Sequence, residues 1–482
     1  MSLPPLIEIV PLTSPVRAEI TVPGSKSITN RALILAALAD GRTTLRGALW
    51  SEDTQVMTDC LRALGFTVDV QQDPAESCNR TITVDGLGGR LPRAGTAERP
   101  LELFVGNAGT AARFLAAMVC LGDGVYRLSG VPRMHERPQA ALFAALRELG
   151  YRVDSPNDKL PAVISSQRPA VSGQRSATVS VTESSQFASA LLLAGTVGGW
   201  QVEITGANED ELPYVDMTRE LVKVFPDNGG EFQIEPDASS GSYFWGAAWL
   251  LFRSDFIETF ERAAKKLGRE VSAGESVQGS ASDLSNISVA HWPSSHWQID
   301  QDWVDLISGP EPGSAGNGNK GSSEPSQRLR LFLAIPSEVS RRYDLGDSIM
   351  TGIALTPLND QSVRFTDLGR LRVQECERVV ALRTELTKCG AKVIEAGDTL
   401  TVFPSALHGA EIETYDDHRM AMCFAVLGLK VPGIKIKHPA CVKKTFPNFF
   451  QKLATPPPHG LGAEIRDAAT GRKLALEELF AD

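Results

Sequence analysis

Apolar residues recur along the N-terminal half of the chain in short runs that alternate between two regular periods. Runs typical of strands cover residues 18–22, 81–84 and 124–128, each bounded by Gly, Pro or polar residues. Runs with the helical period cover residues 30–39, 53–64, 110–121, 139–149 and 184–193. Because strands and helices alternate, the pattern predicts an α/β fold.

The order of these runs also repeats. A helix, a strand, another helix and a strand pair follow one another, with residues 53–57 opening one such unit and residues 130–133 leading into another. The similarity lies in the pattern and not in residue identity, so it predicts a weak internal repeat of one supersecondary unit.

One segment lacks this pattern. Residues 308–327 read SGPEPGSAGNGNKGSSEPSQ, a composition that buries too little apolar area to offset the entropy of ordering, so we expect a mobile insert. Upstream, Trp292, Trp297 and Trp303 occur in a stretch with little periodicity. Packing of an inserted subdomain explains them better than ligand stacking.

Composition bounds the possible functions. With 482 residues, 42% of them hydrophobic, the chain can form two or three domains with cores of their own. The formal net charge of -10 argues against a general nucleic-acid or membrane surface, so an anionic ligand needs a local basic cluster. No basic leader and no apolar run of membrane-spanning length occurs, which predicts a cytoplasmic protein.

The seven cysteines contain no C-x-x-C pair and no zinc-type spacing, which indicates reduced thiols and no metal site. Cys376 and Cys389 fall in one helix-like stretch and Cys423 in another. Packing in a core or interface is the favoured role for all three, because free cysteine is readily buried.

The segment PGSKSITNR at residues 23–31 carries the strongest chemical signal. It places Lys26 and Arg31 beside a Pro-Gly turn, directly before the apolar run at residues 32–38. The amides of a first helical turn have no partner within the helix and carry the positive end of its dipole. The sequence therefore predicts a phosphate or carboxylate site at the start of a helix.

Further segments share this character. Residues 106–113 read GNAGTAAR, a second glycine-bearing helix start, where Gly109 would let a ligand approach the backbone. Arg133 and Arg137 precede another helix, and Ser184, Ser185 and Gln186 open a further one. Charged clusters toward the C-terminus cover residues 344–348, 372–378, 416–422 and 443–447.

Taken together, PGSKS, NAGTA, DHRMAM and KTFP, in this order between Pro23 and Leu453, resemble the EPSP synthases (3-phosphoshikimate 1-carboxyvinyltransferases). The resemblance implies the two-domain enolpyruvyl transferase fold of the α/β class, with each domain an inside-out arrangement of three βαβαββ units that close over the substrates. Residues 23–236 would form the shikimate 3-phosphate-binding domain. Residues 1–22 and 237–482 would form the second domain, which includes the insert.

The implied reaction transfers the enolpyruvyl group of phosphoenolpyruvate to the 5-hydroxyl of shikimate 3-phosphate and releases phosphate. The resemblance assigns the phosphoenolpyruvate contacts to Lys26, Arg137, Arg378, Arg419 and Lys444, with the Gly109 backbone and Gln186. On the shikimate 3-phosphate side it assigns Lys26, Ser27, Arg31, Ser184, Ser185, Gln186 and Asp347. Asn107 and Gln374 complete the expected substrate contacts.

The chemistry needs proton transfer to and from the reacting groups. We expect Asp347 to act as the base and Glu375 as a proton-transfer partner, with Lys26 or Lys444 assisting. An Asp before Ser348 could also be a helix N-cap, so that alternative stays open. His418 could carry a proton or could be a hydrogen-bonded structural histidine.

Several positions depart from the family pattern. The family commonly has Asn at Arg370, Lys at Gln374 and Ser near Glu211, so we hypothesise that Arg370 substitutes for the absent lysine and that Glu211 turns away or pairs with it. Phe114 stands where many members have Pro, so the response to glyphosate does not follow from the resemblance. Residues 252–342 match poorly, and we expect the match to resume at Asp347.

Two other functions remain to be weighed. The sister transferase that acts on UDP-N-acetylglucosamine shares the fold, but the residues after Lys26 and Ser184-Ser185-Gln186 favour the shikimate substrate. A non-catalytic homologue would bind ligands without turnover, although such a site would not need both Asp347 and Glu375 among its cations. We expect a monomer that binds small anionic substrates, with no metal, organic cofactor, nucleic acid or membrane partner.

Overall fold

Two separate hydrophobic cores divide the chain into two units. The computed structural model describes residues 3–166, 175–206, 212–267, 285–308 and 335–481. Unit 1 comprises Met1–Val22, Ala238–Ser294 and Ile299–Asp482, and unit 2 comprises Pro23–Asp237 with Ser295–Gln298. Of the expected insert at residues 308–327, only Ser308 lies within the described residues.

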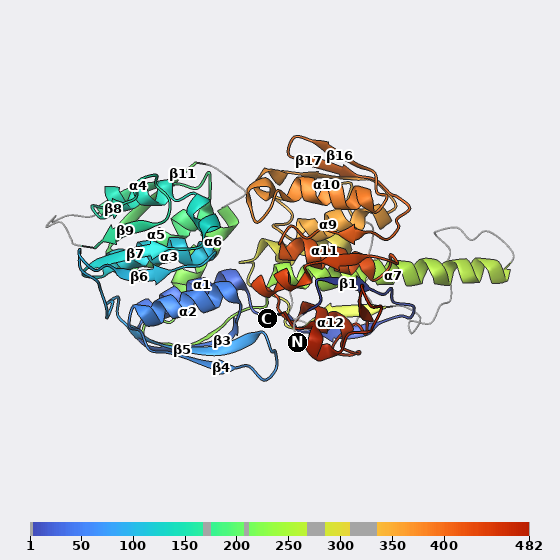
Figure 1. Ribbon diagram of the computed structural model, residues 1–482, viewed down its shortest axis with the longest axis horizontal. Helices are drawn as coiled ribbons and strands as arrows, with labels where there is room; N and C mark the ends of the chain where they lie inside the picture. Colours follow the sequence, from blue (N-terminus) through green and yellow to red (C-terminus); the bar gives the residue numbers. More distant parts are fainter. Residues whose placement is uncertain (1–2, 167–174, 207–211, 268–284, 309–334, 482) are drawn as a thin grey trace, which may run out of the picture. The chain divides into compact units, whose positions relative to one another are not determined.

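Unit 2 contains the helices of the N-terminal half (Figure 1), which are α1 (Lys26–Leu38), α2 (Glu52–Ala63), α3 (Gly109–Met118), α4 (Ala140–Glu148), α5 (Ser185–Gly198) and α6 (Leu212–Val224). Its strands are β3 (Asp40–Leu49), β4 (Val68–Gln72), β5 (Asn79–Leu87), β6 (Leu101–Phe104), β7 (Val125–Ser129), β8 (Arg152–Asp154), β9 (Ala162–Ser165), β10 (Arg175–Ser180), β11 (Trp200–Thr205) and β12 (Gly230–Gln233).

Unit 1 contains the helices α7 (Ala238–Leu267), α8 (Trp303–Ser308), α9 (Ile349–Leu355), α10 (Arg378–Lys388), α11 (His418–Gly428) and α12 (Phe449–Ala454). Its strands are β1 (Leu6–Ile9), β2 (Arg17–Ile20), β13 (Asn286–Val289), β14 (Glu338–Ser340), β15 (Val363–Thr366), β16 (Val393–Ala396), β17 (Thr399–Val402), β18 (Glu411–Ile412), β19 (Lys435–Lys437) and β20 (Ile465–Asp467).

The sheets repeat one topology. Sheet β6-β7-β9-β8 in unit 2 and sheet β14-β15-β17-β16 in unit 1 have the same strand order, with the first pair parallel and the other two pairs antiparallel. In both, a helix follows each of the first two strands, so each is a βαβαββ unit. The repeat that the sequence predicted is therefore confirmed.

Two further four-stranded sheets have this arrangement but take one strand from a distant part of the chain. Sheet β12-β3-β5-β4 uses β12, which follows β5 by more than 140 residues, and sheet β18-β19-β1-β20 uses the N-terminal β1. The parallel pairs β10-β11 and β2-β13 complete the sheets seen in the described residues. The fold is the predicted two-domain α/β architecture.

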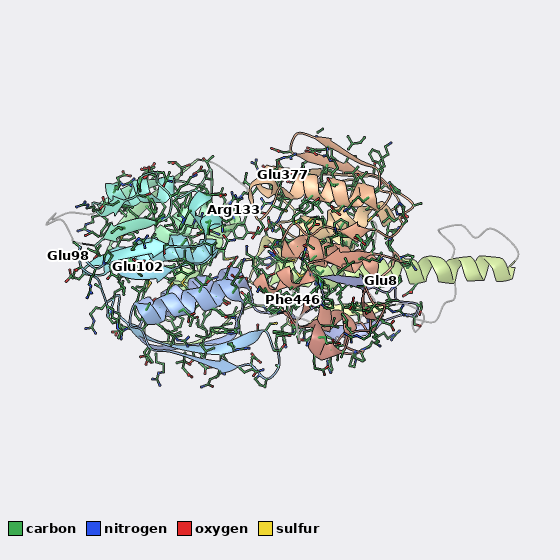
Figure 2. All side chains as sticks on the ribbon, viewed as in Figure 1. Glu8, Glu98, Glu102, Arg133, Glu377 and Phe446 are labelled. Carbon is green, nitrogen blue, oxygen red and sulfur yellow. The ribbon has the colours of Figure 1, made fainter. Side chains whose placement is uncertain are left out.

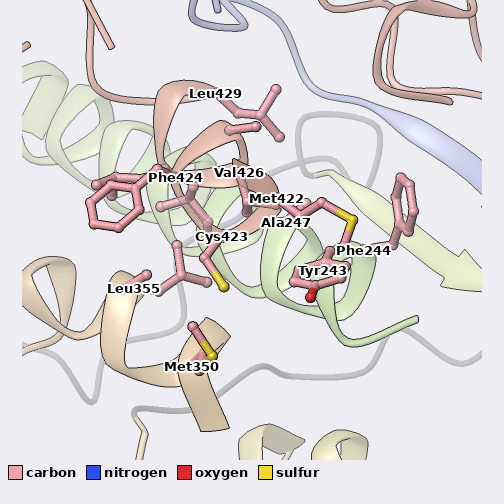
Figure 3. Packing of buried hydrophobic residues seen from close by; sticks show 14 of the residues in the cluster. Tyr243, Phe244, Ala247, Met350, Leu355, Met422, Cys423, Phe424, Val426 and Leu429 are labelled. Atoms are coloured by element: carbon pink, nitrogen blue, oxygen red, sulfur yellow. The ribbon is translucent and has the colours of Figure 1, made fainter. Parts of the chain in front are cut away.

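Each unit has buried helices, α1, α3 and α5 in unit 2 and α9 and α11 in unit 1. Every residue of α3 is buried, as is every residue of α1 from Ile28 to Leu38. Most of these residues are apolar, and Arg31 and Arg113 are the charged exceptions. The strands instead alternate, as in β2, whose residues are exposed and buried in turn. In unit 1, α7, α9 and α11 pack together through Tyr243, Met350 and Cys423 (Figure 3).

The structure also corrects some predicted boundaries. The first helix begins at Lys26, four residues before the predicted start at Asn30, so residues 26–31 are helical. Cys376 lies in a bend before α10 and not in a helix, whereas Cys389 and Cys423 are buried as predicted. Trp303 is buried in unit 1, and Trp297 packs against the core of unit 2, so the tryptophans have packing roles. Among the described helices, none is long and apolar enough to cross a membrane.

Candidate active site

Three buried helices of unit 2 begin at the same place. Arg31 in α1 donates from Nη2 to the Ser189 hydroxyl of α5 at 3.1 Å, and its guanidinium lies 5.3 Å from the ring centroid of Phe114 in α3. Arg113 of α3 in turn lies 5.9 Å from the Phe187 ring of α5. Because all five residues belong to the first two turns of their helices, the N-terminal amides of α1, α3 and α5 gather at one end, where they can bind an anion.

Polar side chains surround this point. Lys26, the first residue of α1, has its Nζ 3.2 Å from Oδ2 of Asp53, which orients the ammonium group. The Ser184 hydroxyl caps α5 by accepting from the amide of Gln186 at 3.3 Å, and Ser185 is the first residue of that helix. The predicted contacts on α1 and α5 therefore lie at the starts of adjacent helices.

Gly109 makes room for two guanidinium groups at the start of α3. A Cβ atom at this position would lie 2.4 Å from Nη1 of Arg113 and 2.6 Å from Nη2 of Arg137. Arg137 also donates from Nη1 to the Asn107 carbonyl at 3.1 Å. Arg133, labelled in Figure 2, instead forms an exposed ion pair with Glu136, so of the two arginines before α4 only Arg137 reaches this site.

In unit 1, Arg378 is the centre of a buried ion network. Its side chain is 1% exposed and its Nε lies 2.7 Å from Oδ2 of Asp417. Nη2 contacts Glu375 at 2.9 Å, and Nη1 lies 3.4 Å from Asp347 and donates to Gln374. Glu377 (Figure 2) caps α10 by accepting from the Val380 amide at 2.6 Å, which fixes the start of the helix that carries Arg378.

Asp347 joins three arginines in this network. Its carboxylate lies 2.9 Å from Arg341, 3.4 Å from Arg378 and 3.4 Å from Arg419. Burial alone would raise the pKa of Asp347, but the charges of Arg419, Arg341 and Arg378 outweigh it and hold that pKa well below its usual range. The N-cap of α9 is Ser348, so the alternative that Asp347 caps this helix is wrong.

The remaining charges of the network come from α11 and the turn before α12. Lys444 Nζ lies 2.9 Å from Oε1 of Glu375, so this carboxylate bridges Lys444 and Arg378. Asp417 caps α11 by accepting from the Arg419 amide at 2.9 Å. His418 is buried, and burial lowers its pKa well below the usual value, which favours the neutral, structural histidine over a proton carrier.

The comparisons with known proteins agree with this chemistry. The family model for EPSP synthase (3-phosphoshikimate 1-carboxyvinyltransferase) matches residues 10–258 and 339–453. The 3-phosphoshikimate 1-carboxyvinyltransferase of Opitutus terrae is 36% identical to the chain, over 94% of this chain and 98% of the relative. This chain belongs to the EPSP synthase family. A second relative of the same name, from Trichormus variabilis, is 35% identical over 93% of this chain and 98% of its own length.

Solved structures show the same fold. The EPSP synthase from Acinetobacter baumannii superposes with a TM-score of 0.60 at 20% identity, covering 96% of this chain and 100% of that chain. The enolpyruvyl transferase NikO from Streptomyces tendae gives a TM-score of 0.60 at 15% identity, covering 97% of this chain and 99% of that chain. The family match skips residues 259–338 and resumes at residue 339, earlier than the predicted Asp347.

The structure describes some of the positions that depart from the EPSP synthase pattern, and others lie outside the described residues or remain untested. Gln374 lies within the ion network, where it donates to both oxygens of Asp347 at 3.2 and 3.4 Å and accepts from Arg378. Phe114 packs against Arg31. Glu211 lies outside the described residues, and the substitution of Arg370 for the missing lysine stays a hypothesis.

Sequence reasoning missed several charged residues of this family site. Arg341 is 2% exposed, yet it was passed over because it stands in a poorly matching segment beside Arg342. Asp53 lies within a predicted helix, and Asp417 lies within DHRMAM, and neither position by itself indicates an ion pair. The signal that was available for Asp417 is its place directly before a helix, which is typical of a capping residue.

The described residues offer another cavity of about 330 Å³, between α5, β11 and α6. Leu191, Trp200 and Val222 are among its mainly apolar lining residues, and none of the predicted site residues contributes to it. Arg219 and Lys223 also line it but are paired with Asp216 and Glu220, so the pocket does not suit a polyanionic substrate. Among the described residues, no group of three or more His, Cys, Asp or Glu side chains has the arrangement of a metal site.

Proposed function

We propose that this chain transfers the enolpyruvyl group of phosphoenolpyruvate to the 5-hydroxyl of shikimate 3-phosphate and releases phosphate. The observation that carries the proposal is the buried network in which Asp347 and Glu375 lie among Arg341, Arg378, Arg419 and Lys444. It combines cations that suit phosphate and carboxylate groups with two carboxylates available for proton transfer. The family membership and the curated relatives support the same reaction.

In unit 1, Arg378, Arg419 and Lys444 bind phosphoenolpyruvate. These cations are already paired with carboxylates of the protein, so an arriving substrate anion exchanges with Asp347 or Glu375 as their partner. Once a cation turns to the substrate, it stabilises the ionised form of Asp347 less, and the pKa of that carboxyl rises. Substrate binding thereby converts a weak proton acceptor into a better base.

In unit 2, the starts of α1, α3 and α5 bind the anionic groups of the substrates. Lys26, Ser27 and Arg31 contact shikimate 3-phosphate, together with Ser184, Ser185 and Gln186. Arg137, the Gly109 backbone and the Asn107 region add a further anion site. Backbone amides and fixed guanidinium groups stabilise charge without reorganising during the reaction, which favours catalysis.

The reaction needs three proton movements. Asp347 accepts the proton of the 5-hydroxyl while the oxygen of that hydroxyl bonds to C2 of phosphoenolpyruvate. Glu375, together with Lys444, delivers a proton to C3. The tetrahedral intermediate then returns a proton from the new methyl group to Glu375 as the bond between C2 and the phosphate oxygen breaks. This restores the double bond and releases phosphate.

Phosphate release tests the function directly. We expect purified protein to release phosphate only when phosphoenolpyruvate and shikimate 3-phosphate are both present, with EPSP formed in equal amount. Binding of both substrates without turnover would indicate a non-catalytic homologue. Turnover with UDP-N-acetylglucosamine in place of the shikimate substrate would indicate the sister activity. The family match favours neither outcome.

The residue roles have their own test. Asp347→Asn removes the base and should lower kcat by about 10²- to 10⁴-fold. The same substitution at Asp360, an exposed partner of Arg253, should leave kcat unchanged and serves as the control. Equal kcat values for the two variants would show that Asp347 is not the base. The expectations of a cytoplasmic monomer without cofactor stay predictions.

A further inference from the structure

A buried carboxylate outside the family match holds the loop that carries Asp347. Asp300 is 3% exposed and belongs to a short helical turn, Ile299–Asp302, within the segment that the family model skips. Its Oδ1 accepts from the amide of Gly346 at 2.8 Å, from the amide of Ser348 at 3.1 Å and from the Ser348 hydroxyl at 2.6 Å. Three of its hydrogen bonds therefore come from the two residues that flank Asp347.

The loop and the start of α7 approach this carboxylate closely. A Cβ atom at Gly346 would lie 3.0 Å from Oδ1 of Asp300 and 2.9 Å from Cγ2 of Ile299, so only glycine lets the loop approach this closely. The second oxygen of Asp300 accepts from the Ser239 hydroxyl at the start of α7. Asp300 thus joins the Asp347 loop to a helix of the core.

The segment that carries Asp300 is itself anchored by packing. Trp303 follows the turn directly, is 1% exposed, and lies against Gly352 of α9, where an added Cβ would be 3.3 Å from its ring. The indole of Trp292 donates to the Gln301 carbonyl at 3.1 Å. A support that is fixed on both sides can hold a catalytic group within the small tolerance that the chemistry requires.

We propose that Asp300 is a positioning residue for the enolpyruvyl transfer, acting through the backbone of the loop that presents Asp347 to its arginines and to the substrate. This inference rests on the proposed function, in which Asp347 is the base. Asp300 itself touches neither the substrate nor the reacting atoms. The hydrogen bonds that it accepts set the direction of the neighbouring side chain.

The first test compares Asp300→Ala with Asp300→Asn. The alanine variant loses every acceptor, and because a shift of about 1 Å can cost roughly 100-fold in rate, we expect kcat to fall 10- to 100-fold while either KM changes less than about threefold. Asparagine keeps an oxygen for Gly346 and Ser348, so it should restore kcat to within about threefold of the wild type. Equally low kcat for both variants would overturn the proposal, since it would show that the negative charge and not the positioning matters.

The second test removes Asp347 as well. If Asp300 acts through Asp347, adding Asp300→Ala to Asp347→Ala should change kcat by less than about threefold, because residues that act as a unit are not additive. Multiplied losses would overturn the proposal. Asp305→Asn, at an exposed site on the following helix, is the matched control and should leave kcat unchanged.

Folding and the activity itself are checked in the same series. Ser348→Ala deletes one of the three bonds without touching the core carboxylate, so a two- to tenfold fall in kcat with unchanged circular dichroism is expected even if Asp300→Ala fails to fold. An unchanged kcat in Ser348→Ala together with a low kcat in Asp300→Asn would contradict the positioning role. Absence of phosphate release in the wild type would instead contradict the proposed function.

Discussion

Two buried arginines, Arg31 in unit 2 and Arg378 in unit 1, are held by different kinds of partner. The described hydrogen-bond partners of Arg31 are oxygens of neutral groups, namely the hydroxyls of Thr218 and Ser189 and the carbonyls of Ser27 and Tyr214. In unit 1, Arg378 is paired with three carboxylates. Both side chains are almost fully buried.

This difference separates two ways of preparing an anion site. Around Arg31 the positive charge is desolvated but not neutralised by the described residues, and burial lowers its pKa to about 10. Around Arg378 the charge is balanced, so an anion must replace a carboxylate of the protein. In the proposed function, binding in unit 1 is therefore coupled to the protonation of Asp347, whereas binding in unit 2 mainly adds a partner.

The largest effect should come from removing the two arginines in turn. Arg378→Met leaves three carboxylates without their shared cation and should lower the free energy of unfolding by about 3–5 kcal/mol. Arg31→Met leaves only neutral oxygens unpaired and should cost about 1–3 kcal/mol. Urea unfolding followed by circular dichroism measures both.

Arg383→Met on the same helix as Arg378 is the control. Its guanidinium is 43% exposed and pairs with Glu395, so the loss should stay below about 1 kcal/mol. If Arg378→Met lowered the free energy of unfolding no more than Arg31→Met, the pairing of Arg378 with carboxylates would contribute nothing extra to stability.

The pH dependence of stability sharpens the comparison for unit 1. Burial lowers the pKa of His418, helped by the charges of Arg419, Lys444 and Arg378 and opposed by Glu375. Because the unfolded histidine titrates near about 6.5, its stabilising contribution is complete above that pH and is lost as the pH falls below it. The free energy of unfolding should fall by up to about 1.4 kcal/mol per pH unit between about pH 6.5 and 5.

The His418→Asn variant should lose this slope. His459 is exposed, so His459→Asn provides the control in which the slope persists. Urea titrations at a series of pH values measure the difference. A slope that survives in His418→Asn would show that another group causes it.

A smaller effect is expected at the helix start in unit 2. In Gly109→Ala the new methyl group meets Arg113 and Arg137 at 2.4 and 2.6 Å, and the flexible guanidinium ends must move. We expect KM for phosphoenolpyruvate to rise about tenfold, which corresponds to about 1.4 kcal/mol, with kcat changed less.

The matched substitution is Gly195→Ala in α5, where the nearest atom to the new methyl group would be 3.9 Å away. This change should leave KM unaltered and can raise stability by up to about 1 kcal/mol, because alanine favours a helix over glycine. Steady-state kinetics that show the same KM for both variants would remove Gly109 from the substrate site.

Local patterns were enough to find helices α1 to α5 and strands β2, β5 and β7. The predicted helices at residues 53–64 and 139–149 correspond to α2 and α4 within one residue at each end. The apolar spacing and the residues that begin and end these helices are local features of the sequence. The start of α1 was placed too late because Ser25 and Lys26 carry no apolar signal, although the helix already begins there. The helix α7 was not among the predicted helices, although the family match covers its residues up to 258.

The sequence by itself determined the α/β class, the presence of a helix close behind each of the segments PGSKS and NAGTA, and the residue types of an anion site, since all of these depend on neighbours a few positions apart. The tertiary structure alone decided which charges meet. Arg31 reaches Thr218 across 187 positions, and Asp300 reaches Ser348 across 48. Pairing, burial and the resulting shift in the pKa of Asp347 depend on distances in space, and no local pattern contains those distances.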